Sequence, residues 1–518
     1  MHRMVHEYVF GNLSQSDPLC NAWSGSFGSF YCRGRRNRMY DVTIVGCGIV
    51  GASLAYTLSR YDLRVLVLER ENDVAMGTTK ANSAIVHAGY DPAHGTLMAR
   101  LNIRGSEMME ALCRDLSVKY KRVGSFVLAF DEAQKEHLEQ LYRNGVKNGV
   151  PGMELLDGDQ ARAMEPALAE NVLAALYAPS AAIIDPWGLC IAEAETAVRN
   201  GVTLKLRSGV TGMEAREDSV LLHTASGDYE TRYAVNCAGG WGHEVCAMTG
   251  EWEWEAQPSR GEYYLLDKSS GSLVSRVIFQ CPTDAGKGVL LAPTVHGNLI
   301  VGPNARPAAD PGSTETTLDG LEEVAAASRK SVPGVDLRQS IRNFSGVRAV
   351  TSEPDFIIRP ARAMPRMLHV AGIKSPGLSA APAIAEYAVS LLAEMGVTLT
   401  EKPDWNGKRQ QVRFKELSAE EKAALVARDP RYGRVICRCE TITEGEILDA
   451  IHSPIPPCSV DGVKRRAGAG MGRCQGGFCG PRVLDILARE LNCSPLDVLQ
   501  DGDGTFILTA ETKGGAEA

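Results

Sequence analysis

The sequence predicts an α/β protein in which a Rossmann-like domain is interleaved with a mainly β domain and followed by a small third domain. Three observations support this fold class. A glycine-rich turn joins a strand to a helix near residue 46, short strands dominate residues 251–340, and four closely spaced cysteines lie beyond residue 430. A chain of 518 residues exceeds what one hydrophobic core usually holds. Two or three domains are therefore expected.

Composition narrows the functional classes. Hydrophobic residues make up 44% and charged residues 23% of the chain, which is ordinary for a globular protein. No apolar run approaches the length of a membrane-spanning helix. The net charge of -8 gives no general attraction to nucleic acid. Cysteines before residue 400 occur singly, which argues against a secreted disulfide framework. We expect a cytoplasmic protein that reaches the inner face of a membrane only through a partner.

Residues 1–38 are expected to be a disordered extension. They lack apolar periodicity and end in a basic run, and they contain no apolar segment of the kind a secretory signal needs. Two origins fit this composition. The extension is either the product of an early start codon, with Met39 as the true start, or a targeting or docking arm.

The stretch from Tyr40 to Arg70 carries the first functional motif. A β-branched run leads into Gly46, Gly48 and Gly51, a helix follows, and a second strand ends at Glu69. In such a turn the glycines permit a tight bend, a close approach of backbone amides to a diphosphate, and close packing of helix on strand. The acid after the second strand can accept hydrogen bonds from a ribose. The motif predicts dinucleotide binding but does not separate FAD from NAD.

Several later segments have the small, polar character of loops that lie along a cofactor. The loop at residues 77–92 combines hydroxyls, an amide and His87. A single histidine among apolar neighbours is often a core residue, yet its neutral form could also take a proton from an alcohol. The strand at 233–237 ends in Ala238 and Gly239, and glycine-rich loops recur at 343–348 and 368–378. Helices are expected at 104–116, 132–148 and 381–394, and a strand at 123–130.

The runs ANSAIVHAGYDP, SRGEYYL, HGNLIVGPNA, SGVRAV, DFIIR, AGIKSPGLSAAPAI and KPDWNGK carry a family resemblance. Together they strongly resemble FAD-dependent glycerol-3-phosphate oxidases and dehydrogenases of the D-amino-acid-oxidase-like superfamily. The first run is also similar to the L-2-hydroxyglutarate dehydrogenases. The resemblance covers roughly residues 40–408 in the same motif order, and it implies FAD as the cofactor.

The resemblance also implies site residues. It assigns FAD-binding parts to roughly 40–115, 181–250 and 341–400, and a substrate domain to roughly 116–180 and 251–340. The residues expected to hold FAD are Gly46, Gly48, Gly51, Glu69, Arg70, Thr79, Asn82, Ser83, Ala238, Gly239, Gly346, Gly372, Lys374, Ser375, Gly377 and Leu378.

The same resemblance makes His87 the catalytic base. Substrate contacts are expected from Ser83, Lys287, Arg348 and Ser375. Those types suit the oxidation of an anionic alcohol, because a base must take the hydroxyl proton and cations must hold the anionic end. Without the resemblance, a surface salt bridge would be the simpler role for each cation. Lys374 could face either the flavin or the substrate.

Four cysteines near the C-terminus form a second motif. Cys437 and Cys439 are separated by one residue, and Cys474 and Cys479 by four. Four thiolates can bind zinc or an iron-sulfur cluster, although these gaps differ from the two-residue knuckles of structural zinc sites. The surrounding sequence resembles bacterioferritin-associated ferredoxin-like domains, which implies a [2Fe-2S] cluster. We expect a linker at 401–431, the cluster domain at 432–505 and a tail at 506–518, with Cys458 and Cys493 outside the site.

The combined domains suggest how electrons leave. A one-electron carrier beside a flavin favours a dehydrogenase over an oxidase, and the domain order is similar to that of large subunits of anaerobic glycerol-3-phosphate dehydrogenases. This similarity implies a second flavoprotein subunit and a small cysteine-rich subunit. The leading hypothesis is oxidation of sn-glycerol 3-phosphate to dihydroxyacetone phosphate. The alternatives are oxidation of L-2-hydroxyglutarate or another 2-hydroxy acid, and a non-catalytic electron-transfer subunit.

Overall fold

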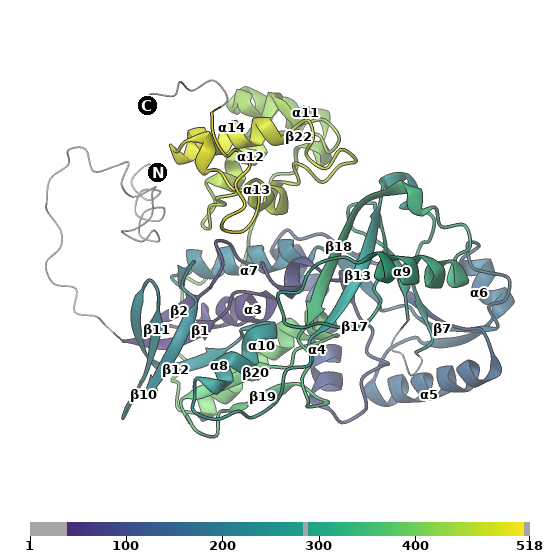
Figure 1. Ribbon diagram of the computed structural model, residues 1–518, viewed down its shortest axis with the longest axis horizontal. Coiled ribbons are helices and arrows are strands. Elements are labelled where there is room, and N and C mark those ends of the chain that lie inside the picture. The colour runs from purple at the N-terminus through teal and green to yellow at the C-terminus, as the bar shows by residue number, and fades with distance from the viewer. Residues whose placement is uncertain (1–38, 283–287, 512–518) are drawn as a thin grey trace, which may run out of the picture.

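The computed structural model describes residues 39–282 and 288–511. Figure 1 shows two sheet-based units side by side and a smaller helical unit that lies against the first of them. Residues 1–38, which were expected to be an extension, and Lys287 lie outside the described residues. None of the described helices combines the length and apolarity needed to cross a bilayer.

The first unit is built on an eight-stranded sheet of order β10-β11-β12-β1-β2-β9, to which β20 and β19 are added beside β12. Strands β1, β2, β9, β12 and β20 pair in parallel. The strands are β1 (Tyr40–Val45), β2 (Val65–Leu68), β9 (Thr203–Lys205), β10 (Val210–Ala215), β11 (Val220–Thr224), β12 (Gly227–Asn236), β19 (Ile357–Pro360) and β20 (Met367–Ala371).

Helices cover this sheet because its central strands are apolar on both faces. All four residues of β2 are buried, as is typical of parallel strands packed between helices. The helices of this unit are α3 (Ile49–Leu58), α4 (Leu97–Asp115), α7 (Pro186–Arg199), α8 (Gly242–Ala247) and α10 (Gly377–Glu394). Helix α4 begins earlier than predicted because the Thr96 hydroxyl caps it by accepting from the Ala99 amide. Helix α10 likewise begins at Gly377 and continues through Pro382.

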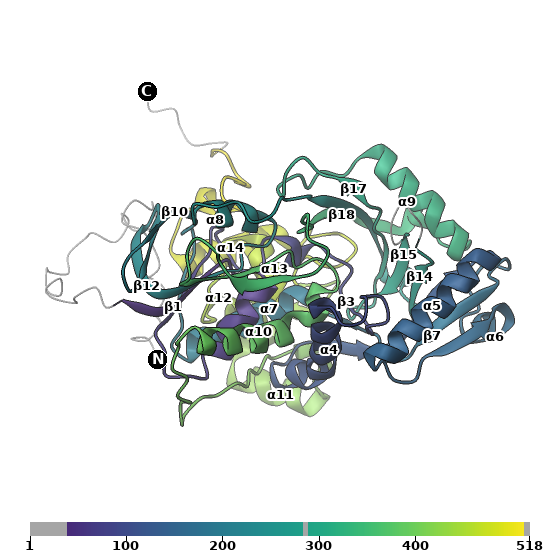
Figure 2. The same ribbon diagram turned by 90° about the horizontal axis from the view of Figure 1, so that it is seen from below.

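The second unit is a nine-stranded sheet of order β17-β13-β16-β15-β14-β5-β7-β6, with β18 paired to β13. Its strands are β5 (Ser125–Ala129), β6 (Glu154–Asp157), β7 (Ala174–Ala178), β13 (Ser259–Leu266), β14 (Val277–Gln280), β15 (Leu290–Pro293), β16 (Leu299–Gly302), β17 (Arg306–Pro307) and β18 (Ser340–Arg348). Helices α5 (Glu132–Asn148), α6 (Gly158–Met164) and α9 (Leu318–Ser331) pack around it (Figure 2). Residues 341–348, expected in a cofactor-binding part, therefore belong to a strand of this sheet.

A three-stranded sheet of β3 (Ile85–Val86), β8 (Ala182–Ile184) and β4 (Tyr120–Arg122) links the two large units. Short 3-10 helices complete the connections: η1 (Thr78–Lys80), η2 (Gly239–Trp241), η3 (Lys268–Ser270), η4 (Leu337–Gln339), η5 (Phe414–Glu416), η6 (Pro430–Gly433) and η7 (Pro495–Asp497). Chain segments from both units thus meet near residues 76–87, where the cavity described below lies.

The third unit has its own hydrophobic core, which includes Ile447, Val463 and Leu487. Its elements are β21 (Val435–Cys437), β22 (Ile442–Thr443), α12 (Glu444–Ile451), α13 (Val460–Ala467) and α14 (Gly480–Leu491), preceded by α11 (Ala419–Arg428). This unit lies close to helix α7 of the first unit (Figure 1). The α/β fold with a mainly β second unit and a small third unit is confirmed.

Candidate functional site

One large cavity, of about 1310 Å³, runs between the units. The glycine turn after β1, the loop at 76–87, the end of β18 and the start of α10 all contribute to its wall. Residues of the third unit also line it, among them Arg465, Gln475 and Asp501. The three units therefore meet around a single space.

The glycine turn shapes one end of the cavity. Gly46 has a φ of +99°, and a Cβ there would lie 2.6 Å from the Cys237 carbonyl oxygen. A Cβ on Gly51 would lie 2.0 Å from the Gly46 carbonyl oxygen, so only glycine lets α3 start so close to β1. The amide of Ile49, in the first turn of α3, donates to Thr79 Oγ1 at 2.9 Å. The amino end of α3 thus opens on the cavity, where it suits a diphosphate.

Glu69 and Arg70 lie where β2 ends, beside the same turn. Burial raises the pKa of Glu69, although its carboxylate accepts from the amides of Cys47 at 2.6 Å and Glu71 at 2.9 Å. The guanidinium of Arg70 lies 4.6 Å from the centre of the Trp241 ring. The fixed carboxylate, the amino end of α3, whose N-cap residue Gly48 has no side chain, and the glycine-lined wall fit the adenosine diphosphate half of FAD.

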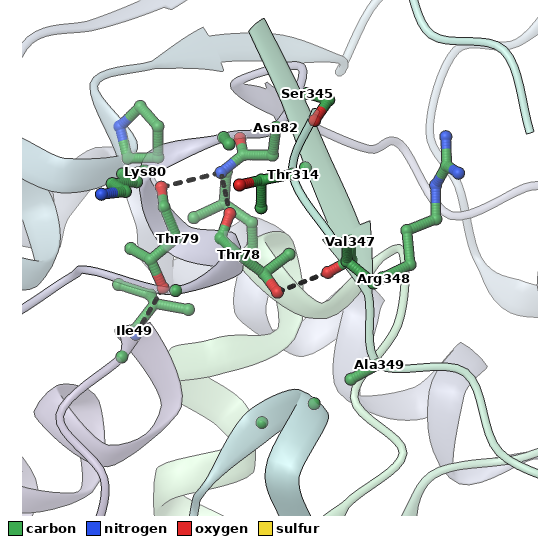
Figure 3. A pocket seen from close by; sticks show the side chains of 18 of the residues that line it. Ile49, Thr78, Thr79, Lys80, Asn82, Thr314, Ser345, Val347, Arg348 and Ala349 are labelled. Carbon is green, nitrogen blue, oxygen red and sulfur yellow. Dashed lines mark hydrogen bonds between the residues drawn. The ribbon is translucent and has the colours of Figure 1, made fainter. Parts of the chain in front are cut away.

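The loop from Thr78 to Ala84 forms the next part of the wall (Figure 3). Asn82 Nδ2 donates to the carbonyl oxygens of Thr78 at 3.2 Å and Thr79 at 2.9 Å, and its Oδ1 accepts from the Ala84 amide at 2.8 Å. Thr78 Oγ1 donates to the Val347 carbonyl at 2.7 Å, which ties the loop to β18. Asn82 lines the cavity, and its side-chain amide is engaged in holding the loop.

His87 lies in the cavity wall, and its side chain is partly exposed, so it is not a buried core histidine. Its Nε2 is 3.2 Å from Ser375 Oγ. Its backbone is fixed from both sides, because its amide donates to Ser379 Oγ and its carbonyl accepts from Ser106 Oγ, each at 2.8 Å. The Phe279 ring stacks on the imidazole at a centroid distance of 5.8 Å. The imidazole is therefore held in place with a ring nitrogen at the cavity.

Arg348 lines the cavity at the end of β18. Its Nη2 donates to the Asn304 carbonyl at 3.0 Å and its Nη1 contacts Ser259 Oγ at 3.3 Å. A guanidinium carries five N–H donors, so these two contacts orient it and leave capacity for an anion. Lys374 also lines the cavity, and its ammonium donates to the Glu353 carbonyl at 3.3 Å.

The cavity brings together most of the predicted residues. Those that line it are Gly46, Gly48, Glu69, Arg70, Thr79, Asn82, Ser83, His87, Ala238, Gly239, Gly346, Arg348, Lys374, Ser375, Gly377 and Leu378. Gly51 and Gly372 are not in the wall: Gly51 supports the turn from behind, and Gly372 lies at a bend with a φ of +64°. Lys287 lies outside the described residues.

Sequence reasoning missed two aromatic residues of the wall. Tyr263 stacks on Phe344 with ring centroids 4.6 Å apart, and its hydroxyl is 3.5 Å from Ser83 Oγ. Phe279 packs on His87. The SRGEYYL run contains Tyr263 and could have drawn attention to it, whereas nothing local to Phe279 indicates a contact with a residue almost 200 positions earlier.

The four predicted cysteines converge in the third unit. Cys439 Sγ lies 3.8 Å from Cys474 Sγ. A hydrogen bond from Cys479 lowers the pKa of Cys437, which also accepts from the backbone amides of Gly470 and Glu440. Four thiol groups surrounded by amide donors suit a [2Fe-2S] cluster, because the donors stabilise the negative charge on thiolate sulfur.

The other two cysteines of this unit are engaged elsewhere. Cys458 Sγ donates to the Asn72 carbonyl at 3.6 Å, and the Cys493 amide donates to the Ala488 carbonyl at the end of α14. Neither has an Sγ contact with the four converging cysteines among the described residues. That neither cysteine is a ligand stays a prediction.

The cluster loops are anchored to the rest of the molecule. Glu440, directly after Cys439, is 6% exposed and accepts from Lys268 Nζ at 2.6 Å and from Lys415 Nζ at 3.2 Å. Met471 and Gln475, on either side of Cys474, line the large cavity. One side of the cysteine site therefore faces the same space as His87.

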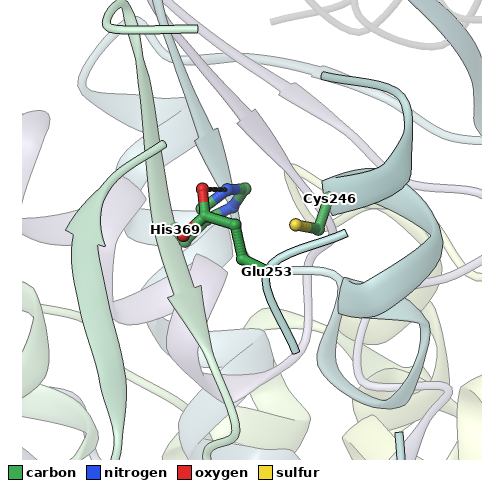
Figure 4. Close-up of side chains that lie close together, drawn as sticks. All are labelled: Cys246, Glu253 and His369. Atoms are coloured by element: carbon green, nitrogen blue, oxygen red, sulfur yellow. Dashed lines mark ion pairs between the residues drawn. The ribbon is translucent and has the colours of Figure 1, made fainter. Parts of the chain in front are cut away.

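A second group of possible metal ligands, Cys246, Glu253 and His369, lies in the first unit (Figure 4). Asn236 Nδ2 donates to the Gly242 carbonyl at 2.8 Å and also lies 3.3 Å from His369 Nδ1. That contact favours Nδ1 as the acceptor, with His369 Nε2 facing Glu253 Oε1 at 3.6 Å. Glu253 also pairs with Arg359, and we interpret the group as a buried polar network.

Comparisons with known proteins agree with this geometry. The family model described as FAD dependent oxidoreductase matches residues 41–391, and the model of the BFD-like [2Fe-2S] binding domain matches residues 435–489. A glycerol 3-phosphate dehydrogenase from Caloramator mitchellensis is 48% identical over 92% of this chain and 99% of its own length. A glycerol 3-phosphate oxidase from Mycoplasma genitalium is 32% identical over 71% of this chain and 97% of its own.

A solved structure extends the comparison to three dimensions. Dithionite-reduced L-alpha-glycerophosphate oxidase from Mycoplasma pneumoniae, with FAD bound, superposes with a TM-score of 0.69 at 29% identity. The superposition covers 73% of this chain and all of the oxidase chain.

Proposed function

The chain belongs to the FAD-dependent oxidoreductases, of the glycerol-3-phosphate dehydrogenase/oxidase type, and we propose that it oxidises sn-glycerol 3-phosphate to dihydroxyacetone phosphate. The placement of His87 and Arg348 in the wall of one cavity carries this proposal. A base and a cation on a shared wall suit an alcohol that bears an anionic group. The full-length similarity to a relative named as a glycerol 3-phosphate dehydrogenase supports this substrate over a 2-hydroxy acid.

His87 takes the proton of the substrate hydroxyl at Nε2. Ser375 lies 3.2 Å from that nitrogen and orients it, while the stacked Phe279 ring limits rotation of the imidazole. Removing the proton builds negative charge on the alcohol oxygen and so promotes loss of hydride from the same carbon. Bound FAD supplies the hydride acceptor.

Arg348 binds the anionic end of the substrate. Its contacts with the Asn304 carbonyl and Ser259 Oγ hold the guanidinium plane, so its remaining donors are oriented before substrate arrives. Ser83 and Tyr263 add hydroxyl groups to the wall. Lys287, outside the described residues, is a further candidate from the family resemblance.

Cys437, Cys439, Cys474 and Cys479 would hold a [2Fe-2S] cluster, and the bound cluster would supply a one-electron acceptor for the reduced flavin. Met471 and Gln475 line the cavity and flank Cys474 in the sequence, which supports electron transfer from the cavity to this site. We further propose that a second flavoprotein subunit and a small cysteine-rich subunit accept the electrons. This route makes the protein a dehydrogenase.

Anaerobic titration of the purified protein tests the substrate. Glycerol 3-phosphate is expected to bleach the flavin absorption and then reduce the cluster, both visible in one spectrum, whereas L-2-hydroxyglutarate leaves them oxidised. Bleaching by L-2-hydroxyglutarate alone would contradict the proposed substrate. If neither compound reduces the flavin while dithionite does, the chain is an electron-transfer subunit.

A further inference from the structure

We propose that the solvent-facing side of the cluster site is a docking surface for an acidic one-electron carrier protein. We assign to it Arg438, Arg473, Phe478 and Arg482, which are exposed and lie within three residues of a cluster cysteine, and we call this set the cluster face. The inference rests on the proposed electron route, and it adds where the electrons leave and what kind of protein takes them.

The first observation is an exposed aromatic residue beside a cluster ligand. Phe478 is 85% exposed and immediately precedes Cys479. It is the most exposed of the large hydrophobic residues that the structure describes. Exposure of a phenyl ring costs free energy in water, and aromatic residues are enriched in protein interfaces. Contact with a partner would cover this ring.

The second observation is charge. Arg438, Arg473 and Arg482 are exposed, and each lies within three residues of a cluster cysteine. Within the described part of the chain, no carboxylate lies within 4.0 Å of these guanidinium groups. The nearby acids offset this charge only in part: Glu440 is already paired with two lysines, and the remaining two, Asp267 near Arg473 and Asp485 on α14, are fewer than the three arginines.

This basic surface contrasts with the protein as a whole, which carries a net charge of -8. A local positive surface on an acidic protein attracts an acidic partner to that position and repels a basic one. The charge pattern therefore selects the partner as well as the position.

The third observation is the two-sided placement of the cysteines. Met471 and Gln475 face the cavity, while Cys439 is exposed on the cluster face. Cys439 Sγ lies 3.8 Å from Cys474 Sγ, so a cluster held by these cysteines would lie between the cavity-lining residues and solvent. In the transfer to the carrier, the reduced cluster loses one electron and returns to its oxidised state, and the carrier gains one electron. No bond is formed or broken, and no proton is transferred.

Stopped-flow electron transfer from the dithionite-reduced holoprotein tests the surface. Rubredoxin serves as the acidic one-electron probe and cytochrome c as the basic one. The variants are Arg473→Gln with Arg482→Gln, and separately Phe478→Ser. Arg428→Gln, an exposed change on α11 of the same part of the chain, is the matched control. The visible spectrum verifies an intact cluster in each protein.

The double arginine variant is expected to slow electron transfer to rubredoxin about tenfold at low salt and to weaken its dependence on ionic strength. Phe478→Ser is expected to slow transfer to rubredoxin at all salt concentrations. Cytochrome c should not be slowed by loss of the arginines, and Arg428→Gln should behave as the unmodified protein. Unchanged rubredoxin rates in the cluster-face variants, or an equal loss in the control, would overturn the proposal.

Because dithionite bypasses the substrate, this result is independent of the proposed reaction. Failure of glycerol 3-phosphate to reduce the cluster would contradict the proposed electron route, whatever the rubredoxin rates. Normal reduction by substrate with unaltered rubredoxin rates would contradict the docking surface alone.

Discussion

The Asp73 carboxylate and the Arg466 guanidinium form a bidentate ion pair, with Oδ1–Nη2 and Oδ2–Nη1 distances of 2.7 and 2.8 Å. Their side chains are 2% and 1% exposed. Asp73 follows β2 of the first unit, and Arg466 lies in α13 of the third. The neighbouring Arg465 contacts both Asp73 and Asp501, so one buried network joins the cofactor cavity to the cluster unit.

Replacing Asp73 with asparagine is expected to destabilise this joint strongly. The change leaves two buried guanidinium groups short of a counter-charge, which typically costs about 3–5 kcal/mol of unfolding free energy. The loss of unfolding free energy is measured by urea unfolding of the third unit, monitored through the decrease in cluster absorption. Asp503→Asn is the control, because its partner Arg207 is partly solvent-exposed and such pairs contribute about 1 kcal/mol or less. Equal losses in the two variants would contradict the buried network's importance.

The same pair predicts a dependence on pH. Burial favours a raised pKa for Asp73, but Arg466 and Arg465 outweigh it and hold the pKa below its usual value. A depressed folded-state pKa contributes stability that is present above the unfolded pKa of about 3.9 and lost as pH falls toward the folded value. The stability difference between the unmodified protein and Asp73→Asn should therefore stay constant near neutral pH and shrink below about pH 4. A difference that grows on acidification would have the wrong sign.

Gly51→Ala is expected to lower FAD occupancy, although residue 51 does not line the cavity. A methyl group there would collide with the Gly46 carbonyl, and relief of the collision would move α3 away from β1. The amino end of α3 would then no longer face the diphosphate. Flavin released on denaturation gives the occupancy. Gly334→Ala is the control, since a Cβ at that position meets nothing within 4 Å, and full occupancy in both variants would refute the expectation.

Cys474→Ser is expected to lose the cluster while substrate still reduces the flavin. The thiol is one of the four that converge, whereas Cys493 has no contact with them among the described residues. Iron content and the electron paramagnetic resonance signal of the reduced protein report the cluster. Cys493→Ser should keep both. Full iron content in Cys474→Ser would remove Cys474 from the ligand set.

Local patterns were enough to predict much of this architecture. The segment from Tyr40 to Glu69 could be predicted because its strand, glycine turn, helix, strand and acid are close together in the sequence. The four cysteines could be predicted because their spacing is visible in the sequence itself. The family resemblance then placed His87 and Ser375 together, although 288 positions separate them.

Other features depend on tertiary contacts that no local pattern encodes. Residues 343–348 read as a glycine-rich cofactor loop, yet they form part of β18 and pair with β13. Gly346 still lines the cavity, where the lack of a side chain lets β18 pass the Ala81 carbonyl closely. The closure of the cavity by Arg465, Gln475 and Asp501 follows from the docking of a separate unit. The side-chain amide of Asn82 is turned back on its own loop, where its Oδ1 accepts from the backbone amide of Ala84. Ala84 has a positive φ of 58°.

The most direct test of the chemistry is at His87. His87→Gln keeps a polar side chain but cannot accept the hydroxyl proton as imidazole does, so flavin reduction by glycerol 3-phosphate should slow by about 10²–10⁴-fold. Ser375→Ala retains the base and removes only the contact to Nε2, so about a tenfold loss is expected from one lost hydrogen bond.

Anaerobic stopped-flow reduction measures both rates, and dithionite reduction of the same proteins controls for flavin access. His87→Gln should therefore reduce its flavin with substrate far more slowly than Ser375→Ala, while dithionite reduces both at the same rate. A His87→Gln rate that matches the Ser375→Ala rate would move the base to another residue of the cavity.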